Sequence, residues 1–261
     1  MSPRQHDAIS LPVPAGGTLR GHLSYHHKPG RWAVLYVHGF GSVRGGEKAV
    51  ALEAACARRG YTFAAFDFRG HGESSGTMLD LRCSALLHDL QAIAEYLEGR
   101  GIGRLCPVGS SMGGWASAWF GLRQPQRIGA CVLVSPALTF PSSIWGRLNE
   151  ADRRAWKQTG RLRVRTEWVD TEIGTGLAEE VNEYALDQLI KGWRWPLLII
   201  HGMQDDVVPY RLSVDLAERA TYLDIELRLY KNGDHRLLAF KDEMAEAAGE
   251  FFARWVSAPF L

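Results

Sequence analysis

The sequence lacks several features that mark other classes of protein. It contains no run of about eighteen apolar residues, and Met1 to Asp7 show no apolar core of a signal peptide, so we expect neither a transmembrane segment nor export. Charge of one sign is also absent, because 30 Lys and Arg oppose 29 Asp and Glu to give a formal net charge of +1. This balance gives no reason to expect a nucleic-acid partner.

Cysteine is scarce and scattered. None of the four cysteines has C-x-x-C spacing, and no clustered histidines accompany them, so we predict no metal site and no cofactor. Their apolar surroundings favour buried, reduced thiols and a cytoplasmic location, although the sequence alone leaves a disulfide open. These cysteines are Cys56, Cys83, Cys106 and Cys131.

What the chain does contain is an alternation of strand-like and helix-like segments. The strand-like segments are continuous apolar runs, typical of parallel strands that are covered on both faces. With 261 residues and 46% hydrophobic content, the chain predicts a single α/β domain over 1–261. The predicted strands are Val34 to Val37, Thr62 to Phe66, Leu105 to Val108, Ala130 to Val134, Pro196 to Ile200 and Ile225 to Tyr230.

Prolines and helical periodicity refine this picture. The segment from Ala8 to His26 alternates and is interrupted by prolines, which predicts an antiparallel hairpin at an edge of the sheet. Pro107 is unusual before a sharp turn, and we expect it at the last, unpaired position of its strand. A stripe at spacings of three and four predicts a helix that packs on the sheet, formed by Leu86, Leu87, Leu90, Ile93, Ala94 and Leu97.

The most informative motif is Gly109-Ser110-Ser111-Met112-Gly113, which reads G-x-S-x-G between a strand-like and a helix-like run. That context is the one a nucleophile elbow requires, with glycines where a Cβ atom would collide. The pattern makes Ser111, rather than Ser110, the candidate nucleophile. A serine hydroxyl is a weak nucleophile until a base takes its proton, so the chain must also supply a histidine and a carboxylate.

Both partners follow in the sequence. Asp205 stands on the loop after the predicted strand that ends at Ile200, and His235 ends a turn after the strand that ends at Tyr230. The carboxyl ends of parallel strands meet at the ligand-binding edge of an open α/β sheet. We therefore predict Asp205 as the acid and His235 as the base, with the neighbouring Asp206 as a solvated or helix-capping residue.

An ester-cleaving site of this kind also needs two backbone N–H groups for the oxyanion. One comes from the residue after the nucleophile, here Met112. The other comes from an earlier loop, His38-Gly39-Phe40-Gly41, where glycines flank Phe40. We expect His38 to fix this loop by hydrogen bonding, and His71 to be structural.

These motifs, together with Asp67-Phe68-Arg69-Gly70-His71-Gly72-Glu73-Ser74, occur in the order found in the α/β-hydrolase superfamily, which the chain resembles over nearly its whole length. It looks most like the serine esterases and thioesterases related to the mitochondrial abhydrolase-domain palmitoyl-protein and acyl-glucuronide hydrolase. The resemblance implies an α/β-hydrolase fold, with a mostly parallel twisted sheet and helices on both faces. The family's D-x-x-V-P pattern places the acid at Asp205.

The sequence between the predicted strand that ends at Val134 and the one that begins at Pro196 separates the elbow from Asp205. We predict that it forms a small cap at about 137–192, with a short hairpin from Leu162 to Val169. A cap this small suits short or medium acyl groups, or a lipid chain on a larger molecule. The basic stretch from Arg147 to Arg165 is interpreted as the solvated face of surface helices.

The sequence thus predicts a serine carboxylesterase that forms an acyl-enzyme on short to medium acyl esters and uses water as its second substrate. An acyl-protein or acyl-CoA thioesterase with the same triad is the nearest alternative. A non-catalytic ligand-binding scaffold of the same fold is the second alternative. The oligomeric state is left open.

Overall fold

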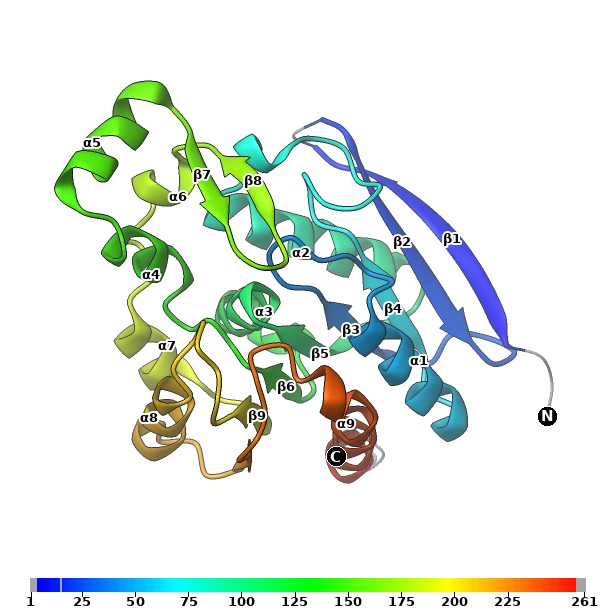
Figure 1. Ribbon diagram of the computed structural model, residues 1–261. Coiled ribbons are helices and arrows are strands. Elements are labelled where there is room, and N and C mark those ends of the chain that lie inside the picture. Colours follow the sequence, from blue (N-terminus) through cyan, green and yellow to red (C-terminus); the bar gives the residue numbers. More distant parts are fainter. Residues whose placement is uncertain (1–3, 15, 257–261) are drawn as a thin grey trace.

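The computed structural model describes residues 4–14 and 16–256, which form an eight-stranded sheet between layers of helices (Figure 1). The strands lie in the order β1-β2-β4-β3-β5-β6-β9-β10. The β1–β2 and β2–β4 pairs are antiparallel and the others are parallel. This is the predicted mostly parallel sheet with an N-terminal hairpin at its edge. The strands are β1 (Gln5–Pro12), β2 (Thr18–Tyr25), β3 (Trp32–Val37), β4 (Phe63–Phe66), β5 (Arg104–Ser110), β6 (Cys131–Val134), β9 (Leu197–Gly202) and β10 (Ile225–Tyr230).

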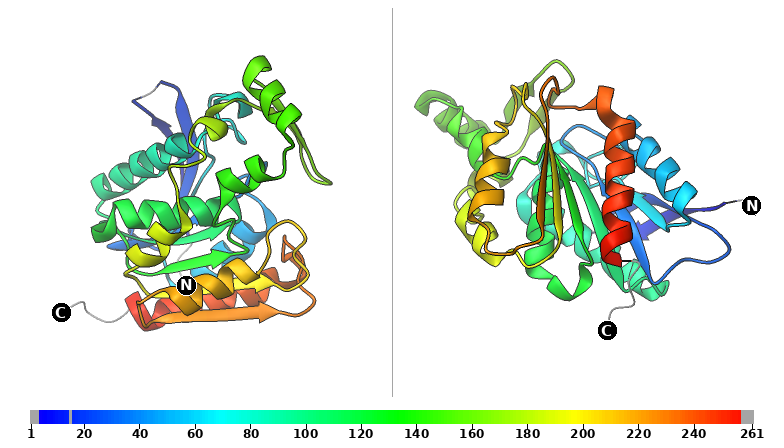
Figure 2. Two further views of the ribbon diagram at one scale, coloured as in Figure 1. Left: turned by 90° about the vertical axis from the view of Figure 1, so that its left-hand side faces the viewer. Right: turned by 90° about the horizontal axis from the view of Figure 1, so that it is seen from below.

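Helices cover both faces of the sheet (Figure 2). Helices α1 and α9 contribute to the apolar core on one face, whereas α2 and α3 contribute to the core on the other. The α-helices are α1 (Glu47–Arg59), α2 (Cys83–Gly99), α3 (Met112–Arg123), α4 (Phe140–Gly146), α5 (Glu150–Thr159), α6 (Gly176–Glu179), α7 (Leu186–Gly192), α8 (Arg211–Arg219) and α9 (Lys241–Val256). Short 3-10 turns are η1 (Met78–Asp80), η2 (Pro125–Arg127) and η3 (Leu238–Phe240).

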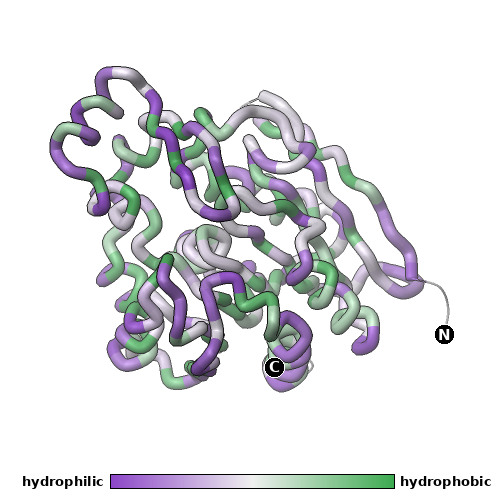
Figure 3. The backbone as a smooth tube through the Cα atoms, viewed as in Figure 1, coloured by the Kyte–Doolittle hydropathy of each residue, from purple (hydrophilic) through white to green (hydrophobic). Residues whose placement is uncertain are grey.

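Strand β3 shows why the predicted strands are apolar throughout. Its side chains alternate between the two cores: Leu35 and Val37 face one, and Val34 and Tyr36 face the other. Each apolar side chain buried in this way contributes about 1.5–3 kcal/mol. The hydrophobic residues are accordingly concentrated in the central strands, whereas the surface segment around α5 is mostly hydrophilic (Figure 3).

The stripe of apolar residues predicted for a helix is confirmed in α2, where all six residues are buried. The expectation for Pro107 is wrong. Pro107 lies within β5, opposite Leu35 of β3, three positions before the strand ends. The carbonyl of Leu105 accepts a hydrogen bond from Gly129 on the β6 side, so the ring nitrogen of Pro107 faces that side too. The β6 ladder begins only at Val108, so the missing N–H costs little there.

The segment 135–196 joins β6 to β9 and contains α4, α5, α6 and α7 together with a small two-stranded sheet, β7 (Leu162–Arg165) and β8 (Asp170–Ile173). We call it the inserted segment; its role as a cap stays a prediction. Its hairpin extends further than expected, because 166–169 form the turn and not the second strand. The Thr166 hydroxyl accepts hydrogen bonds from the N–H groups of Trp168 and Val169 and closes this turn. None of the helices in the described ranges is long and apolar enough to cross a membrane.

Candidate active site

Ser111 lies at the sharp turn between β5 and α3. Its backbone has φ 54° and ψ −117°, a positive-φ conformation that stores about 1–3 kcal/mol of strain in a non-glycine residue. The surroundings hold it there: its N–H donates to the Val134 carbonyl at 2.9 Å, and its carbonyl accepts from the Ala137 N–H at 3.1 Å. The turn therefore presents the hydroxyl at the carboxyl edge of the sheet.

The glycines of the motif allow very close packing at this turn. A Cβ atom on Gly113 would lie 2.1 Å from the Val37 carbonyl oxygen, and one on Gly109 would lie 2.4 Å from the Gly113 carbonyl oxygen. Any side chain at either position would have to displace backbone. The G-x-S-x-G pattern is thus explained by the approach of β3, β5 and α3.

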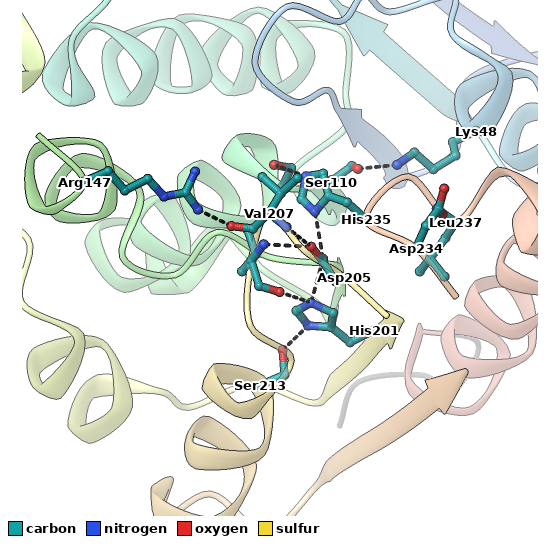
Figure 4. Close-up of polar contacts among 12 residues, drawn as sticks. Lys48, Ser110, Arg147, His201, Asp205, Val207, Ser213, Asp234, His235 and Leu237 are labelled. Atoms are coloured by element: carbon teal, nitrogen blue, oxygen red, sulfur yellow. Dashed lines mark hydrogen bonds and ion pairs between the residues drawn. The ribbon is translucent and has the colours of Figure 1, made fainter. Parts of the chain in front are cut away.

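The structure brings Ser111, His235 and Asp205 into one hydrogen-bonded chain, although they are far apart in sequence. Figure 4 shows the contact between His235 and Asp205. The Ser111 hydroxyl donates to His235 Nε2 at 3.0 Å. On the other side of the ring, the Nδ1–H donates to Asp205 Oδ2 at 2.7 Å. This arrangement leaves Nε2 free to accept the serine proton.

Asp205 is held by two further donors from its own loop. Its Oδ1 accepts from the N–H groups of Val207 at 2.9 Å and Val208 at 2.7 Å. Burial alone would raise the pKa of Asp205, but the hydrogen bonds from His201 and His235 outweigh it and hold the pKa below its ordinary value. The carboxylate therefore stays ionised beside the imidazole. Asp206 is exposed, as expected for a solvated neighbour.

The sequence reasoning missed His201, a buried residue at the end of β9. Its Nε2–H lies 3.0 Å from Asp205 Oδ2 and 3.1 Å from the Val208 carbonyl, and its Nδ1 accepts from the Ser213 hydroxyl at 2.7 Å. His201 and His235 thus both donate to the same carboxylate oxygen of Asp205, Oδ2. The available signal was a histidine at the end of a buried strand, four residues before the acid.

The loop that carries Phe40 lies against the elbow. A Cβ atom on Gly39 would lie 3.1 Å from the Ser110 carbonyl oxygen and 3.3 Å from Ser111 Cβ, so a side chain there would press the loop away from the elbow by a few tenths of an ångström. Met112 follows Ser111 as the first residue of α3, where the helix N-terminus favours negative charge. Both predicted oxyanion donors therefore border the nucleophile, and their role stays a prediction.

His38 fixes this loop through both ring nitrogens. Its Nδ1 donates to the Gly39 carbonyl at 2.8 Å, and its Nε2 accepts from the Phe68 N–H at 3.0 Å. Burial, followed by the nearby His71, lowers the pKa of His38 to about 3, so the ring is neutral. His71 donates from Nδ1 to the Arg69 carbonyl at 3.1 Å, in keeping with a structural role.

The inserted segment contacts all three loops of this site. Val169 fills the space where a Cβ of Gly41 would stand, 2.3 Å from Val169 Cγ2. The guanidinium of Arg236, next to His235, lies 5.6 Å from the ring centroid of Trp168. Arg147 donates to the Val207 carbonyl on the acid loop (Figure 4).

An aromatic wall of buried side chains begins at Trp115, one turn after Ser111 on α3. Phe140 of α4 packs against Phe40 at a ring-centroid distance of 6.4 Å and against Trp115 at 6.2 Å. Trp115 also meets Tyr184 edge-on at 5.0 Å. Trp115, Phe140 and Tyr184 are all buried, so this wall is a packed interior surface.

The cysteines do not have the features of reactive thiols. The four cysteines are free and buried, and burial raises the pKa of each thiol. Across 4–14 and 16–256, no group of three or more His, Cys, Asp or Glu side chains is placed to hold a metal ion.

Known proteins resemble this chain in sequence and fold. The bovine mitochondrial palmitoyl-protein thioesterase ABHD10 is 28% identical over 208 residues, which cover 78% of this chain and 67% of that protein. The structure of the mouse alpha/beta hydrolase domain-containing protein 10 superposes with a TM-score of 0.81 at 22% identity, covering 95% of this chain and 99% of that one. Est1E from Butyrivibrio proteoclasticus, solved with ferulic acid, gives a TM-score of 0.80 at 21% identity over 96% of this chain and 100% of that one.

These findings confirm the resemblance to α/β-hydrolase esterases and thioesterases, and with it the fold. The family described as Hydrolase_4, serine aminopeptidase, S33, matches residues 28–194 and 185–242. That match spans most of the chain, including the elbow, the acid loop and the histidine loop. The protein therefore belongs to the Hydrolase_4 family of α/β-hydrolases.

Proposed function

We propose that this protein is a serine carboxylic ester hydrolase that acts through an acyl-enzyme on short to medium acyl esters. The observation that carries the proposal is the chain of hydrogen bonds from Ser111 to His235 at 3.0 Å and from His235 to Asp205 at 2.7 Å. These are the contacts that a nucleophile, a base and an orienting acid require.

In the first half-reaction, Ser111 Oγ attacks the ester carbonyl carbon while His235 Nε2 accepts the hydroxyl proton. Asp205 keeps Nδ1 protonated and stabilises the imidazolium that forms. The N–H groups of Phe40 and Met112 would receive the oxyanion, and one such donor is worth about 2.7–4 kcal/mol in comparable sites. The tetrahedral intermediate then collapses, and the leaving alcohol takes its proton from His235.

In the second half-reaction, a water molecule attacks the acyl-Ser111 ester. His235 accepts a proton from this water and returns it to Ser111 Oγ as the carboxylic acid leaves. The same residues perform both halves, so the reaction needs no cofactor.

The preference for short to medium acyl groups is supported by the aromatic wall. Trp115 lies on α3, one turn after Ser111, and packs against Phe140 and Tyr184, all three being buried. A long acyl chain would have to displace these packed rings or lie along the surface.

Thioester cleavage by the same machinery is the alternative, because the curated relatives include a palmitoyl-protein thioesterase. The acyl-enzyme and the base are identical in the two reactions, and only the leaving group differs. A non-catalytic scaffold is the second alternative, and the assembled triad disfavours it. We further propose a cytoplasmic location, supported by the four free, buried thiols.

The test compares p-nitrophenyl esters from acetate to palmitate with acyl thioesters of matched chain length, using the native protein. We expect kcat/KM to be highest for short esters. An organophosphate should label Ser111 stoichiometrically, as shown by mass spectrometry of the labelled peptide.

The outcomes separate the alternatives. A higher kcat/KM on matched thioesters, or an optimum at palmitate, would replace the proposal by the thioesterase function. Folded native protein that neither labels at Ser111 nor turns over any ester would support the scaffold.

A further inference from the structure

A lysine contacts the nucleophile elbow from outside the triad. Lys48 lies in the first turn of α1, just after the loop that carries Phe40. Its Nζ donates a hydrogen bond to Ser110 Oγ at 2.7 Å (Figure 4). Ser110 is only 3% exposed and directly precedes Ser111. The Lys48 side chain therefore ties the start of α1 to the last residue of β5.

The ammonium group of Lys48 also faces the two other loops of the site. Arg236 on the histidine loop acts on it as a like charge, and the carboxylates of Asp234 and Asp205 act as opposite charges. Burial, the largest effect, and then Arg236 lower the pKa of Lys48 to about 8, against the pull of the carboxylates. At neutral pH the group is thus mostly a cation, held beside the elbow by a neutral hydroxyl.

We propose that Lys48 is a positioning residue for the ester-cleaving reaction: through Ser110 it fixes the elbow against α1, and its charge favours the negative tetrahedral intermediate. This inference rests on the proposed function. The charge sits next to the residue that precedes the nucleophile and beside the loop expected to bind the oxyanion. A fixed cation in a partly buried site stabilises developing negative charge without reorganisation.

The proposal predicts opposite trends for activity and stability in alkaline solution. As pH rises through about 8, Lys48 loses its proton in the folded protein, so the charge that favours the intermediate disappears and kcat falls. The unfolded chain keeps this proton up to its ordinary pKa of 10.5. Between these values the unfolded state binds more protons, so the contribution of Lys48 to stability increases with pH. Unfolding linked to Lys48 therefore cannot explain an alkaline loss of activity.

A serine bonded to a lysine can also form a nucleophile–base pair of its own. Here Ser110 is buried beneath the elbow, whereas Ser111 carries the bond to His235. We therefore assign Ser110 to support and Ser111 to attack. Ester turnover that survives Ser111→Ala but is lost in Ser110→Ala would reverse this assignment and overturn the proposal.

The experiment measures kcat and KM from pH 6 to pH 10 on a short p-nitrophenyl ester, for the native protein and for Lys48→Met, Lys48→Arg and Ser110→Ala. Lys48→Met keeps much of the side-chain volume and removes the charge. We expect kcat at pH 7 to be about tenfold lower, which is the order of the decrease expected from the loss of one charge in a partly screened interior. KM should change by less than about twofold. The fall near pH 8 should disappear.

The other variants separate the charge from the contact. Lys48→Arg should recover most of kcat and show no fall near pH 8, because a guanidinium stays charged. Ser110→Ala loses only the hydrogen bond to Lys48. We therefore expect a smaller decrease in kcat than for Lys48→Met, and kcat should still fall near pH 8. Lys28→Met is the matched control, since Lys28 is exposed at the other edge of the sheet, and it should behave like the native protein.

Two results would overturn the proposal. One is a native profile without a fall above pH 8, which requires no variant. The other is a folded Lys48→Met protein that has native kcat, or one whose kcat is lower but still falls near pH 8 as in the native protein. Labelling of Ser111 tests the proposed function separately, so a protein that labels and turns over esters but ignores Lys48 refutes the inference alone.

Discussion

Two regions of the molecule are stabilised in different ways: the loops that carry Asp205 and His235, and the inserted segment. At the carboxyl edge of the sheet, Asp205 alone receives hydrogen bonds from His235, His201, Val207 and Val208, and its side chain is fully buried. In the inserted segment, by contrast, ion pairs such as Arg163–Asp170 lie on the surface, where water and salt screen them and they stabilise the fold little. Changes at Asp205 should therefore act mainly on the reaction, whereas the loss of a surface ion pair in the inserted segment should be tolerated.

The largest effect should come from the nucleophile. Ser111→Ala removes the attacking oxygen, and we expect kcat on a short ester to fall by about 10⁶-fold, as in other triads. Ser10→Ala, on the exposed edge strand, is the control and should keep native activity. Retention of more than a few per cent of native kcat by folded Ser111→Ala would assign the attack to another group.

The next largest effect should come from the acid. Asp205→Asn leaves the shape of the site but disturbs the tautomer of His235, and kcat should fall by about 10⁴-fold. Asp206→Asn changes the exposed neighbour and should leave kcat within about twofold of native. Equal losses in the two variants would contradict the assignment of the acid to Asp205.

A third comparison concerns stability. Leu35→Ala removes a core side chain that is 1% exposed, and we expect the free energy of unfolding to fall by about 2–5 kcal/mol. Arg154→Ala, in the inserted segment, breaks only a surface ion pair with Glu150 at 3.6 Å. We expect this variant to change the free energy of unfolding by less than about 0.5 kcal/mol. Urea unfolding of both variants measures the difference, and similar losses would show that the inserted segment is as tightly stabilised as the sheet.

The smallest effect should be a pH dependence. The pKa of Asp205 is lowered in the folded protein, so its ionised form contributes stability above its ordinary pKa of 3.8, and this contribution is lost as pH falls below that value. Asp205→Asn should therefore lose less stability between pH 5 and pH 3 than the native protein. Identical slopes for native and Asp205→Asn proteins, measured by thermal unfolding, would contradict the assigned shift.

The sequence was sufficient to predict the sheet and to select Ser111, Asp205 and His235, which the structure brings into contact, because each is tied to a short local pattern at the end of an apolar strand; their roles stay predictions. It did not reveal Lys48 or His201 as members of the site. Lys48 meets Ser110, 62 positions away, and no local pattern records such a contact. Pro107 was misplaced for a related reason, since its position depends on where the neighbouring strand begins to pair.

The contact between Val169 and Gly41 limits how this protein can be re-engineered. The tip of the inserted hairpin touches the loop that carries Phe40, so the two pieces must be compatible in shape. A chimera that borrows 135–196 from a relative would also have to import a residue of valine-like size at the hairpin tip, or leave a hole above that loop. Exchange of the inserted segment is therefore coupled to the shape of the loop that carries Phe40.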